Sequence, residues 1–474
     1  MNTVSDRQVV KLGPGKVKAS ARINLNGQTH EVSFIIQGDS VYEGIEPFLT
    51  LALLPAMASN QPIELDEPAS PRLLKGFNIV QDVFTNWDKQ FHRIAVKVPA
   101  KTLPAPKKPG ITGKLPAGIY PNLKTSARFL RQNLNKKTLK RAWQDRASLL
   151  KGQPGSGPQD TRKVACFFSG GVDSFYTLLK NSAEIDTLIF VSGGFDVYPH
   201  PDNGELRRMI TERLRQVARE MGKEFIEVEA DLQNFSDNYV NWFYYYGSAM
   251  GALAQLLSNR FKKIYIASSY PYNNLKPCGS NPISDPLWRT EALEIIHDGC
   301  ESYRAKKVVT IAKSPIAVSN LRVCQNYGEN REYNCGKCEK CLRTMAVLQA
   351  QGILENSAFP STINLEAIST VDLPEHLTRS WKDILGLLNE TGKEPELARV
   401  IRERITKLPG TGIEEKIAAL EEELARQERL YTKQKAWARS LEAHNVWLTE
   451  QYETATRWGQ SLENEILARQ KKRA

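Results

Sequence analysis

VACFFSGGVDSFYTLLK, residues 164–180, starts with five apolar residues, turns at a serine and two glycines, and continues in the pattern of a helix. The apolar run predicts a buried strand, and the residues from Val172 onward predict the first turns of a helix. Such a turn points consecutive backbone N–H groups into one concavity, and the helix start adds the positive end of its dipole. The stretch therefore predicts a phosphate-binding loop between a strand and a helix. The alternative is an incidental glycine turn with a serine that caps the helix.

The residues of this loop suit the binding of a phosphate and a divalent cation. Gly170 and Gly171 let the backbone approach an anion without a Cβ clash. The two serines offer hydroxyl donors, and Asp173 can hold a Mg²⁺ ion that bridges phosphate oxygens. The predicted nucleotide-binding residues of the loop are Ser169, Gly170, Gly171, Val172, Asp173 and Ser174. The predicted catalytic residues among them are Ser169, Asp173 and Ser174.

Apolar runs alternate with amphipathic stretches between residues 161 and 350. The apolar runs are VACFF, TLIFVSGG, EFIEVEADL, KIYIASSY and KVVTIA. Strands that alternate with helices at this spacing predict an α/β fold with a mostly parallel sheet covered on both faces. Because ligands of such sheets bind at the carboxyl ends of the strands, the loop after VACFF lies where a ligand is expected.

The segments on either side of this domain differ from it in composition. Residues 17–37 alternate apolar and polar residues around Asn26-Gly27, which predicts a β-hairpin. The chain then passes through a basic stretch rich in Pro and Gly, which is typical of an extended connector. The predicted domains are an N-terminal α/β module (1–100), a basic linker and helix (101–160), the central nucleotide-binding domain (161–350), a helical segment (351–410) and a coiled coil (411–474).

The formal net charge is +11, and the positive charge is concentrated between Lys89 and Lys163. That window holds 18 Lys and Arg against two acidic residues, a local net charge of +16. Such a segment can hold the phosphate backbone of a nucleic acid, and the alternative is an ordinary solvated surface. The first residues lack the apolar core of a signal peptide, and no run of about 18 apolar residues occurs, so a cytoplasmic protein without a membrane span is expected.

Four of the seven cysteines lie in CQNYGENREYNCGKCEKCLRTM. They are Cys324, Cys335, Cys338 and Cys341, with the spacing C-x10-C-x2-C-x2-C. Four thiolates can complete a tetrahedral Zn²⁺ site, and Lys337, Lys340 and Arg343 are positioned to offset its negative charge. An iron–sulfur cluster and the absence of any metal are the alternatives. Because four cysteines leave no coordination position open, a structural role is expected.

Residues 411–474 predict a coiled coil. YTKQKAWARSLE at 431–442 and YETATRWGQSLE at 452–463 repeat with a period of 21 residues, which is three heptads. A heptad-like seam precedes them, formed by Ile413, Ile417, Leu420 and Leu424. The expected role is self-association or the binding of a protein partner, and the alternative is a single helix packed on the rest of the chain.

The six residues SGGVDS at 169–174 match the SGGxD[ST] signature of the PP-loop ATP pyrophosphatases, so the central domain resembles that superfamily. Its members include asparagine, GMP and NAD synthetases and tRNA-modifying enzymes. The resemblance implies an adenine nucleotide alpha hydrolase-like (HUP/PP-loop) core that binds ATP with Mg²⁺. It also implies cleavage between the α and β phosphates, transfer of AMP to a carboxylate or carbonyl oxygen, and retention of the departing pyrophosphate in the loop.

A PP-loop followed by a four-cysteine site is also the combination found in the 7-cyano-7-deazaguanine synthase family, which converts a carboxylate into a nitrile through adenylation and ammonia. Residues 161–350 therefore resemble the QueC-like branch. After its third predicted strand this chain has NWFYYYGSAMG, without the arginine that the synthase family carries there, so the acceptor stays unassigned. The additional domains are closer to QueC-like proteins outside queuosine biosynthesis, and a role in antiviral defence is among the implications.

Further candidate residues follow the other predicted strands. Ser268 and Ser269 end KIYIASSY at the expected cleft, and Asp196 follows the second strand, where it is a candidate to contact ribose. Asp285 is a candidate ligand for a metal or a substrate amine, and Arg289 for a carboxylate or phosphate, both with a catalytic role. The alternative for this pair is a helix-capping aspartate and a surface arginine.

Three more polar residues follow in the same region. Glu301 and Arg304, three residues apart, predict a surface ion pair, with a functional role as the alternative. His297 is expected to be structural, because no Ser/His/Asp or Cys/His arrangement is recognisable in the sequence.

Together these features predict an ATP-dependent adenylating ligase of the QueC-like group that uses ATP, Mg²⁺ and a structural Zn²⁺. It is expected to release pyrophosphate and then to let ammonia or another amine displace AMP, with catalysis mainly by positioning and electrostatics. Two alternatives stay open. One is a tRNA-modifying PP-loop enzyme whose basic residues 89–163 grip RNA, and the other is an ATP-sensing scaffold without turnover.

Overall fold

The structure of the 474-residue chain is a computed structural model that describes residues 2–99, 160–193, 204–324, 332–374 and 377–406. The chain divides into two units, Met1–Ile401 and Arg402–Ala474, and the packing described below is that of the first. Asp196, the predicted coiled coil and nearly all of the predicted basic linker lie outside the described residues. Among the described helices, none has both the length and the apolar character needed to cross a membrane.

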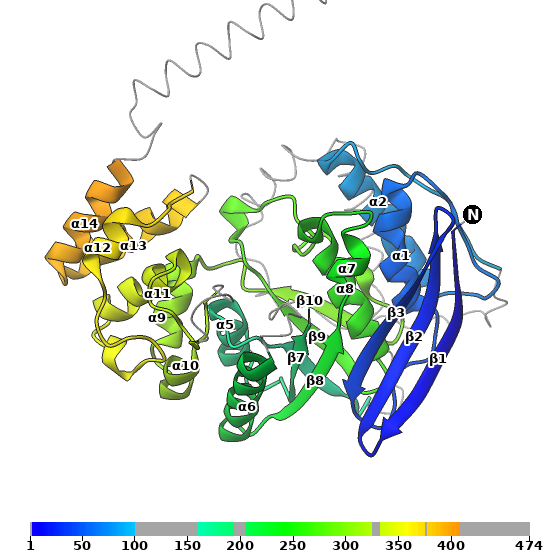
Figure 1. The fold of residues 1–474 in the computed structure, drawn as a ribbon, viewed down its shortest axis with the longest axis horizontal. Coiled ribbons are helices and arrows are strands. Elements are labelled where there is room, and N and C mark those ends of the chain that lie inside the picture. Colours follow the sequence, from blue (N-terminus) through cyan, green and yellow to red (C-terminus); the bar gives the residue numbers. More distant parts are fainter. Residues whose placement is uncertain (1, 100–159, 194–203, 325–331, 375–376, 407–474) are drawn as a thin grey trace, which may run out of the picture. The chain divides into compact units, whose positions relative to one another are not determined.

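An eight-stranded sheet with the order β1-β2-β3-β8-β7-β6-β9-β10 is the centre of the fold (Figure 1). Its strands are β1 (Thr3–Gly13), β2 (Lys16–Leu25), β3 (Gln28–Gln37), β6 (Lys163–Phe167), β7 (Thr187–Ser192), β8 (Glu224–Ala230), β9 (Phe261–Ala267) and β10 (Glu294–Asp298). The strands from β8 to β10 pair in parallel, and the neighbours from β1 to β8 pair antiparallel. The prediction of an α/β fold with a mostly parallel sheet is confirmed. A second, small parallel sheet pairs β4 (Ile63–Glu64) with β5 (Val96–Lys97).

Helices cover both faces of the large sheet. One layer contains α1 (Glu46–Ala58), α2 (Pro71–Trp87), α7 (Gln233–Ser236) and α8 (Trp242–Leu256), and the other contains α5 (Val172–Lys180) and α6 (Gly204–Glu220). In β6, Ala165 and Phe167 belong to the core shared with the α1 and α8 layer. The alternate residues Val164 and Cys166 are equally buried and point to the opposite face, where α5 contacts β6. The loop after β6 therefore emerges between two buried layers.

A further group of helices packs beside α5 and α6. Its members are α9 (Arg304–Ile311), α10 (Pro315–Asn320), α11 (Glu339–Ala350), α12 (Leu365–Thr370), α13 (Thr378–Thr391) and α14 (Pro395–Thr406). The described residues also form short 3-10 helices, which are η2 (Tyr272–Asn274) and η3 (Asp285–Trp288) between β9 and β10, and η4 (Leu354–Asn356) after α11. α9 contacts α5, and α11 contacts both α9 and α13. This packing brings residues far along the sequence against the first turns of α5.

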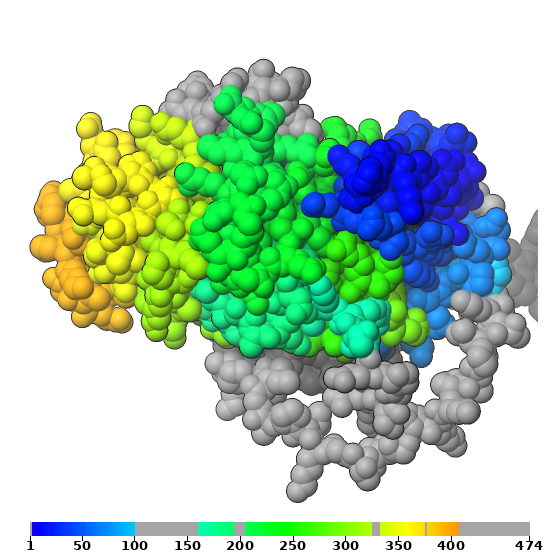
Figure 2. Space-filling model, turned by 90° about the horizontal axis from the view of Figure 1, so that it is seen from below, coloured from blue at the N-terminus to red at the C-terminus, as the bar shows by residue number. Residues whose placement is uncertain are grey.

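The predicted hairpin around Asn26-Gly27 is confirmed. Leu25 pairs with Gln28, and the two turn residues have φ angles of 54° and 83°, a combination that Asn and Gly accept more readily than other residues. The hairpin is not isolated, because β3 pairs with β8 and places Phe34 opposite Ala230. The N-terminal strands and the central domain therefore share one sheet and one hydrophobic core, and in the space-filling view they lie directly against each other (Figure 2).

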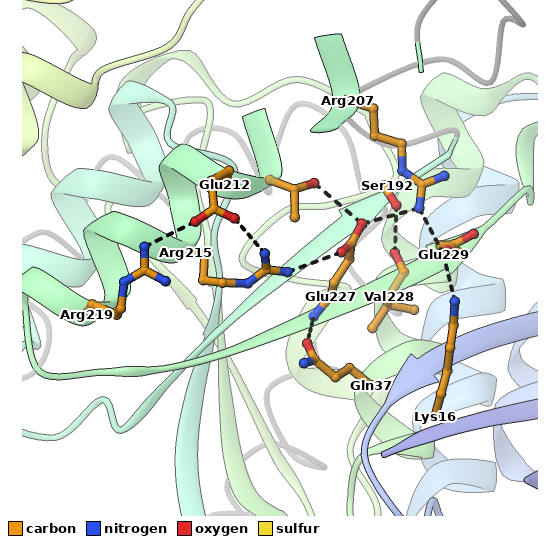
Figure 3. A network of polar contacts seen from close by, with 11 residues as sticks. Lys16, Gln37, Ser192, Arg207, Glu212, Arg215, Arg219, Glu227, Val228 and Glu229 are labelled. Carbon is orange, nitrogen blue, oxygen red and sulfur yellow. Dashed lines mark hydrogen bonds and ion pairs between the residues drawn. The ribbon is translucent and has the colours of Figure 1, made fainter. Parts of the chain in front are cut away.

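Charged side chains cover the same junction on the α6 face (Figure 3). Arg207 of α6 pairs with Glu227 at 3.2 Å and with Glu229 at 3.0 Å. Lys16 of β2 reaches Glu229 at 3.4 Å, and the Oε1 atom of Gln37 accepts a hydrogen bond from the Glu227 backbone N–H. Because these groups are partly exposed, their ion pairs stabilise the junction less than the apolar core does.

One predicted strand is wrong. KVVTIA belongs to helix α9, and the fifth parallel strand is β10, Glu294–Asp298, which is not among the apolar runs of the sequence prediction. Short apolar runs do not separate strand from helix by periodicity alone. The burial pattern gives the reason for the helix, since Ala305, Val308 and Ile311 recur every third residue and form one buried face.

Candidate functional site

The glycine loop lies at the carboxyl end of β6, which has parallel neighbours on both sides. Gly170 has a φ of +73°, and a Cβ at this position would lie 2.7 Å from a Leu214 methyl group. Gly171 precedes α5, and no side chain caps the helix start. The Arg322 backbone N–H donates to the Gly170 carbonyl at 2.8 Å and fixes the loop from outside. The loop thus joins a strand to a helix, as the sequence predicts, and the helix N-terminus is uncapped. The positive φ and the nearby Leu214 methyl group favour glycine at position 170.

A cavity of about 400 Å³ opens in front of this loop. Of the predicted nucleotide-binding residues, those that line it are Ser169, Gly171, Val172, Asp173, Ser174 and Ser269. The cavity crosses the carboxyl ends of three parallel strands, where Phe167 of β6, Val191 of β7 and Ile266 of β9 form its apolar floor. The position agrees with the rule for ligands of α/β sheets.

Three cations line the cavity beside the loop, and each comes from a different part of the chain. They are Arg304 at the start of α9, Arg322 after α10, and Lys340 in the first turn of α11. Burial, together with the neighbouring Arg304 and Arg343, lowers the pKa of Lys340 from 10.5 to about 8. Burial and the two neighbouring guanidinium groups thus both disfavour the charged form of Lys340, and a bound anion would favour it.

Asp173 is the acidic residue of the cavity lining, and it is paired with two cations. Its Oδ1 atom lies 2.8 Å from Lys307 Nζ, and its Oδ2 atom lies 3.3 Å from Arg304. Burial raises the pKa of Asp173, but Lys307 and Arg304 outweigh this effect and hold the pKa below its ordinary value. Lys307 is 1% exposed and also donates to the Ser268 carbonyl at 2.6 Å. The Asp173 carboxylate is therefore ionised, and the buried Lys307 ammonium group holds it in place.

This arrangement limits where a Mg²⁺ ion can bind. Asp173 is the sole carboxylate among the described residues that line the cavity, and both its oxygens already contact a cation. A Mg²⁺ ion requires about six oxygen ligands and usually takes several from substrate phosphates and water. The described lining residues thus do not form a Mg²⁺ site by themselves.

The four cysteines of the cluster lie together at the edge of the same cavity, which Cys324 also lines. Their Sγ atoms all lie within 4.8 Å of one another, and two of the separations are 3.9 Å (Cys335 to Cys341) and 4.0 Å (Cys324 to Cys338). Four sulfurs at about 2.3 Å from one tetrahedral Zn²⁺ would be about 3.8 Å apart. The geometry fits a single ion, and the four residues can hold a metal.

The backbone of the C-x2-C turn supports the same assignment. The N–H groups of Lys337 and Cys338 point at Cys335 Sγ, at 3.5 and 3.3 Å. Gly336, which follows Cys335, has a φ of +67°, an angle that residues with a side chain rarely adopt. Backbone donors aimed at a sulfur stabilise it as a thiolate, the form that ligates metals.

Of the remaining predicted residues, only some lie at the cavity. Ser268 is buried, with its carbonyl bound to Lys307, and Ser269 lines the cavity. Asp285 is fully buried, lies outside the lining and pairs with His297 at 2.7 Å. Arg289 is also not among the lining residues. The structure therefore does not bring these two predicted catalytic residues to the cavity surface.

Glu301 and Arg304 have different partners from those expected. Glu301 pairs with Lys180 and accepts a hydrogen bond from Tyr176, whereas Arg304 turns to Asp173. The predicted ion pair between them is wrong. The reason is that Arg304 opens α9 and Glu301 precedes it, so the i,i+3 spacing of a continuous helix does not apply.

Arg322 and Lys340 are cavity residues that the sequence did not single out as ligands of an anion. Their only sequence signal is their position, two residues before Cys324 and between Cys338 and Cys341. No family model, no curated protein and no solved structure matches this chain.

Proposed function

We propose that this chain is a QueC-like PP-loop enzyme that adenylates a carboxylate or carbonyl acceptor. In the proposed reaction an acceptor oxygen attacks the α-phosphorus of ATP, the bond to the β-phosphate oxygen breaks, and pyrophosphate leaves. Ammonia or another amine then displaces AMP from the adenylated acceptor. The enzyme would therefore be an ATP pyrophosphatase of the ligase type.

One observation carries the proposal. The uncapped start of α5, with the signature SGGVDS, faces a cavity that three cations from distant elements also line. Backbone N–H groups and a helix dipole on one side, and Arg304, Arg322 and Lys340 on the other, form a site for a polyanion rather than for a single carboxylate. Pyrophosphate is the polyanion that such a loop holds in the family that the signature resembles.

Each group of the site has a distinct part in this chemistry. The backbone N–H groups after Gly171 and the three cations would hold the β- and γ-phosphates and stabilise the charge that gathers on them. The buried Lys307 would keep Asp173 ionised and fixed beside the loop. A Mg²⁺ ion bound to the phosphates would add further charge neutralisation. The catalysis would be mainly positional and electrostatic.

We further propose that the cysteine cluster binds zinc and assembles the cation side of the site. Arg322 lies two residues before Cys324, and Lys340 lies between Cys338 and Cys341. Closing four thiolates around one ion fixes both segments, so a metal without a catalytic role would still determine where two phosphate ligands stand.

Product analysis tests the proposal. The protein is incubated with ATP, Mg²⁺ and candidate deazaguanine acids or cell extract, and AMP and pyrophosphate are expected, with no ADP. Asp173→Ala is expected to lower pyrophosphate release at least 100-fold, because the loop loses the carboxylate that Lys307 and Arg304 hold. Ser319→Ala, an exposed change in α10, is the matched control. Formation of ADP, or undiminished pyrophosphate release by Asp173→Ala, would contradict the adenylation mechanism.

The two alternative functions depend on segments of the chain other than the cavity. A tRNA-modifying enzyme depends on the basic residues 89–163, and a scaffold depends on the coiled coil 411–474, and most of both ranges lies outside the described residues. Steep salt dependence of tRNA binding would favour the first. ATP binding without AMP formation would favour the second.

A further inference from the structure

A second, smaller cavity lies where α9, α11 and α13 contact one another. Its volume is about 10 Å³, which is about the space that a single water-sized particle needs. The polar part of its lining consists of Arg304 of α9, Arg343 and Thr344 of α11, and Ser380 of α13, and the rest is aliphatic. The proposed adenylation does not use this cavity, so its charged lining requires another explanation.

The two arginines bring buried donors without acceptors to this place. Arg343 is 7% exposed, and the side chain of Arg304 is 19% exposed. The Nε–H groups of both are shielded from solvent and have no hydrogen-bond partner among the described residues. A guanidinium group stays charged and donates hydrogen bonds without accepting any. Because buried donors without an acceptor are costly and rare, this pair indicates the binding position of an acceptor.

The carboxylates that pair with the two arginines do not satisfy these donors. Arg304 reaches Asp173 Oδ2 at 3.3 Å through a terminal nitrogen, and Asp173 also pairs with a buried lysine. The Nε atom of Arg343 lies 3.0 Å from Glu339 Oε1, an oxygen that also accepts the indole N–H of Trp381 at 2.8 Å. Among the described residues that line the small cavity, none is acidic. Its surface therefore presents two positive groups without a negative one.

Size and polarity narrow the choice of ligand. A carboxylate, phosphate or sulfate group has several heavy atoms and is too large for a space of about 10 Å³. A water molecule fits, but it carries no charge, and its own hydrogens would need acceptors. The Thr344 hydroxyl already donates to the Lys340 carbonyl at 2.8 Å, whereas the half-buried Ser380 can turn its hydroxyl hydrogen to an anion. A monatomic anion matches the volume, the charge and the donors.

We infer that this cavity is a binding site for one chloride ion, held between the guanidinium groups of Arg304 and Arg343 with the Ser380 hydroxyl as a further donor. The ion accepts the N–H groups that lack partners, and the aliphatic surroundings strengthen its attraction to the two arginines. Arg304 lines both cavities, so the ion also holds this arginine at the edge of the larger one. The inference does not depend on the proposed adenylation.

Chloride-35 NMR on the full chain tests the inference, because an ion that exchanges between solution and a protein site broadens the chloride signal. Chloride is varied against gluconate at constant ionic strength, so that the weak attraction to exposed charges stays constant. The wild type is expected to show excess broadening that saturates, with half-saturation below about 0.1 M chloride. Bromide, an ion of similar size, is expected to remove this broadening. Inorganic phosphate, which fits only the larger cavity, is expected to leave it.

Two variants identify the site. Arg343→Met removes one guanidinium group and is expected to weaken chloride binding at least tenfold. Ser380→Ala removes one hydroxyl from a half-buried position and is expected to weaken it at least threefold, which keeps the test decisive if the first variant does not fold. Lys306→Met removes an exposed charge from the same helix as Arg304 and is expected to change the chloride affinity by less than about twofold.

Each of three results would overturn the inference. The absence of saturable broadening in the wild type would mean that a water molecule only occupies the small cavity. Loss of the broadening on addition of inorganic phosphate would place the chloride ion in the larger cavity. Undiminished chloride binding in folded Arg343→Met and in Ser380→Ala would show that the ion binds elsewhere on the chain.

Discussion

The two sides of the proposed phosphate site are built in different ways. On one side, a single segment from Phe168 to Ser174 supplies backbone N–H groups from an uncapped helix start. On the other side, Arg304, Arg322 and Lys340 come from separate elements and meet beside the cysteine cluster. The first side is a property of the local chain, whereas the second exists only when the tertiary packing is complete. Substitutions on the two sides should therefore have unequal effects.

The largest effect is expected when the cysteine cluster is opened. Cys335→Ser should lower the zinc content from about one ion per chain to near zero and weaken ATP binding more than tenfold, because Arg322 and Lys340 lose their anchor. Metal analysis and calorimetry measure the two values, with Cys166→Ala, outside the cluster, as control. Equal zinc content in variant and parent would remove the metal assignment. Loss of zinc with unchanged ATP affinity would contradict the proposal that the metal positions Arg322 and Lys340.

Next in size is the link between the two sides. Lys307→Met should lower the free energy of unfolding by about 3 kcal/mol, because it leaves the Asp173 carboxylate with Arg304 alone. The exposed neighbour change Lys306→Met should cost less than about 0.5 kcal/mol. Urea denaturation measures both, and equal losses would contradict the role of the buried pair.

The same pair has a defined pH dependence. The pKa of Asp173 is lower in the folded chain than in the unfolded chain, where it is about 4. The ionised Asp173 therefore adds to the free energy of unfolding above pH 4, and this addition is lost as the pH falls through the lowered pKa. The difference in the free energy of unfolding between the wild type and Lys307→Met should therefore become smaller below about pH 4. A constant difference from pH 7 to pH 3 would contradict this account.

Removing one cation should weaken ATP binding less than disturbing the whole cation side. Lys340→Met is expected to weaken ATP binding about tenfold, as for the loss of one hydrogen bond to a charged group. Lys337→Met changes an exposed lysine of the same cysteine loop and should leave the affinity within about twofold. If both variants lose affinity equally, the effect arises from general charge and not from the cavity position.

The smallest effect is expected on the backbone side. Ser169→Ala removes one hydroxyl from the lining but keeps every loop N–H group, so ATP affinity should fall about threefold. Calorimetry with the wild type as reference measures the change. A loss as large as that of Lys340→Met would show that side chains, and not the backbone, dominate both sides.

The sequence predicts the local parts of this molecule and misses those assembled by packing. The loop 169–174 and the hairpin at Asn26-Gly27 are determined by neighbouring residues, and their structures agree with the prediction. The pair Asp285–His297 is twelve residues apart along the chain and depends on the position of β10 beside β9. β10 itself was missed, because its five residues carry too short an apolar run for the period of a strand to be recognised.

The two missed cations follow the same rule. In the sequence, the position of Arg322 and Lys340 beside the cysteines links Lys340 to the charge of the cluster, but it does not indicate that either side chain lines a cavity. In the structure they line the cavity beside the four cysteines, whose proximity the spacing suggests but whose orientation only the fold determines. Asp285 shows the opposite case, since a conspicuous acidic residue in a polar segment is buried behind the cavity wall.

The pairing of β3 with β8 has a practical consequence for dissecting this protein. A fragment that starts at residue 160 would retain the glycine loop and the cysteines but would lose β1, β2 and β3. The backbone groups of β8 that now pair with Phe34 and Ile36 would become a bare strand edge, and the apolar side chains under the hairpin would face water. Such an edge is a template for aggregation. A fragment designed to keep this cavity without exposing β8 should therefore include the first three strands of the chain.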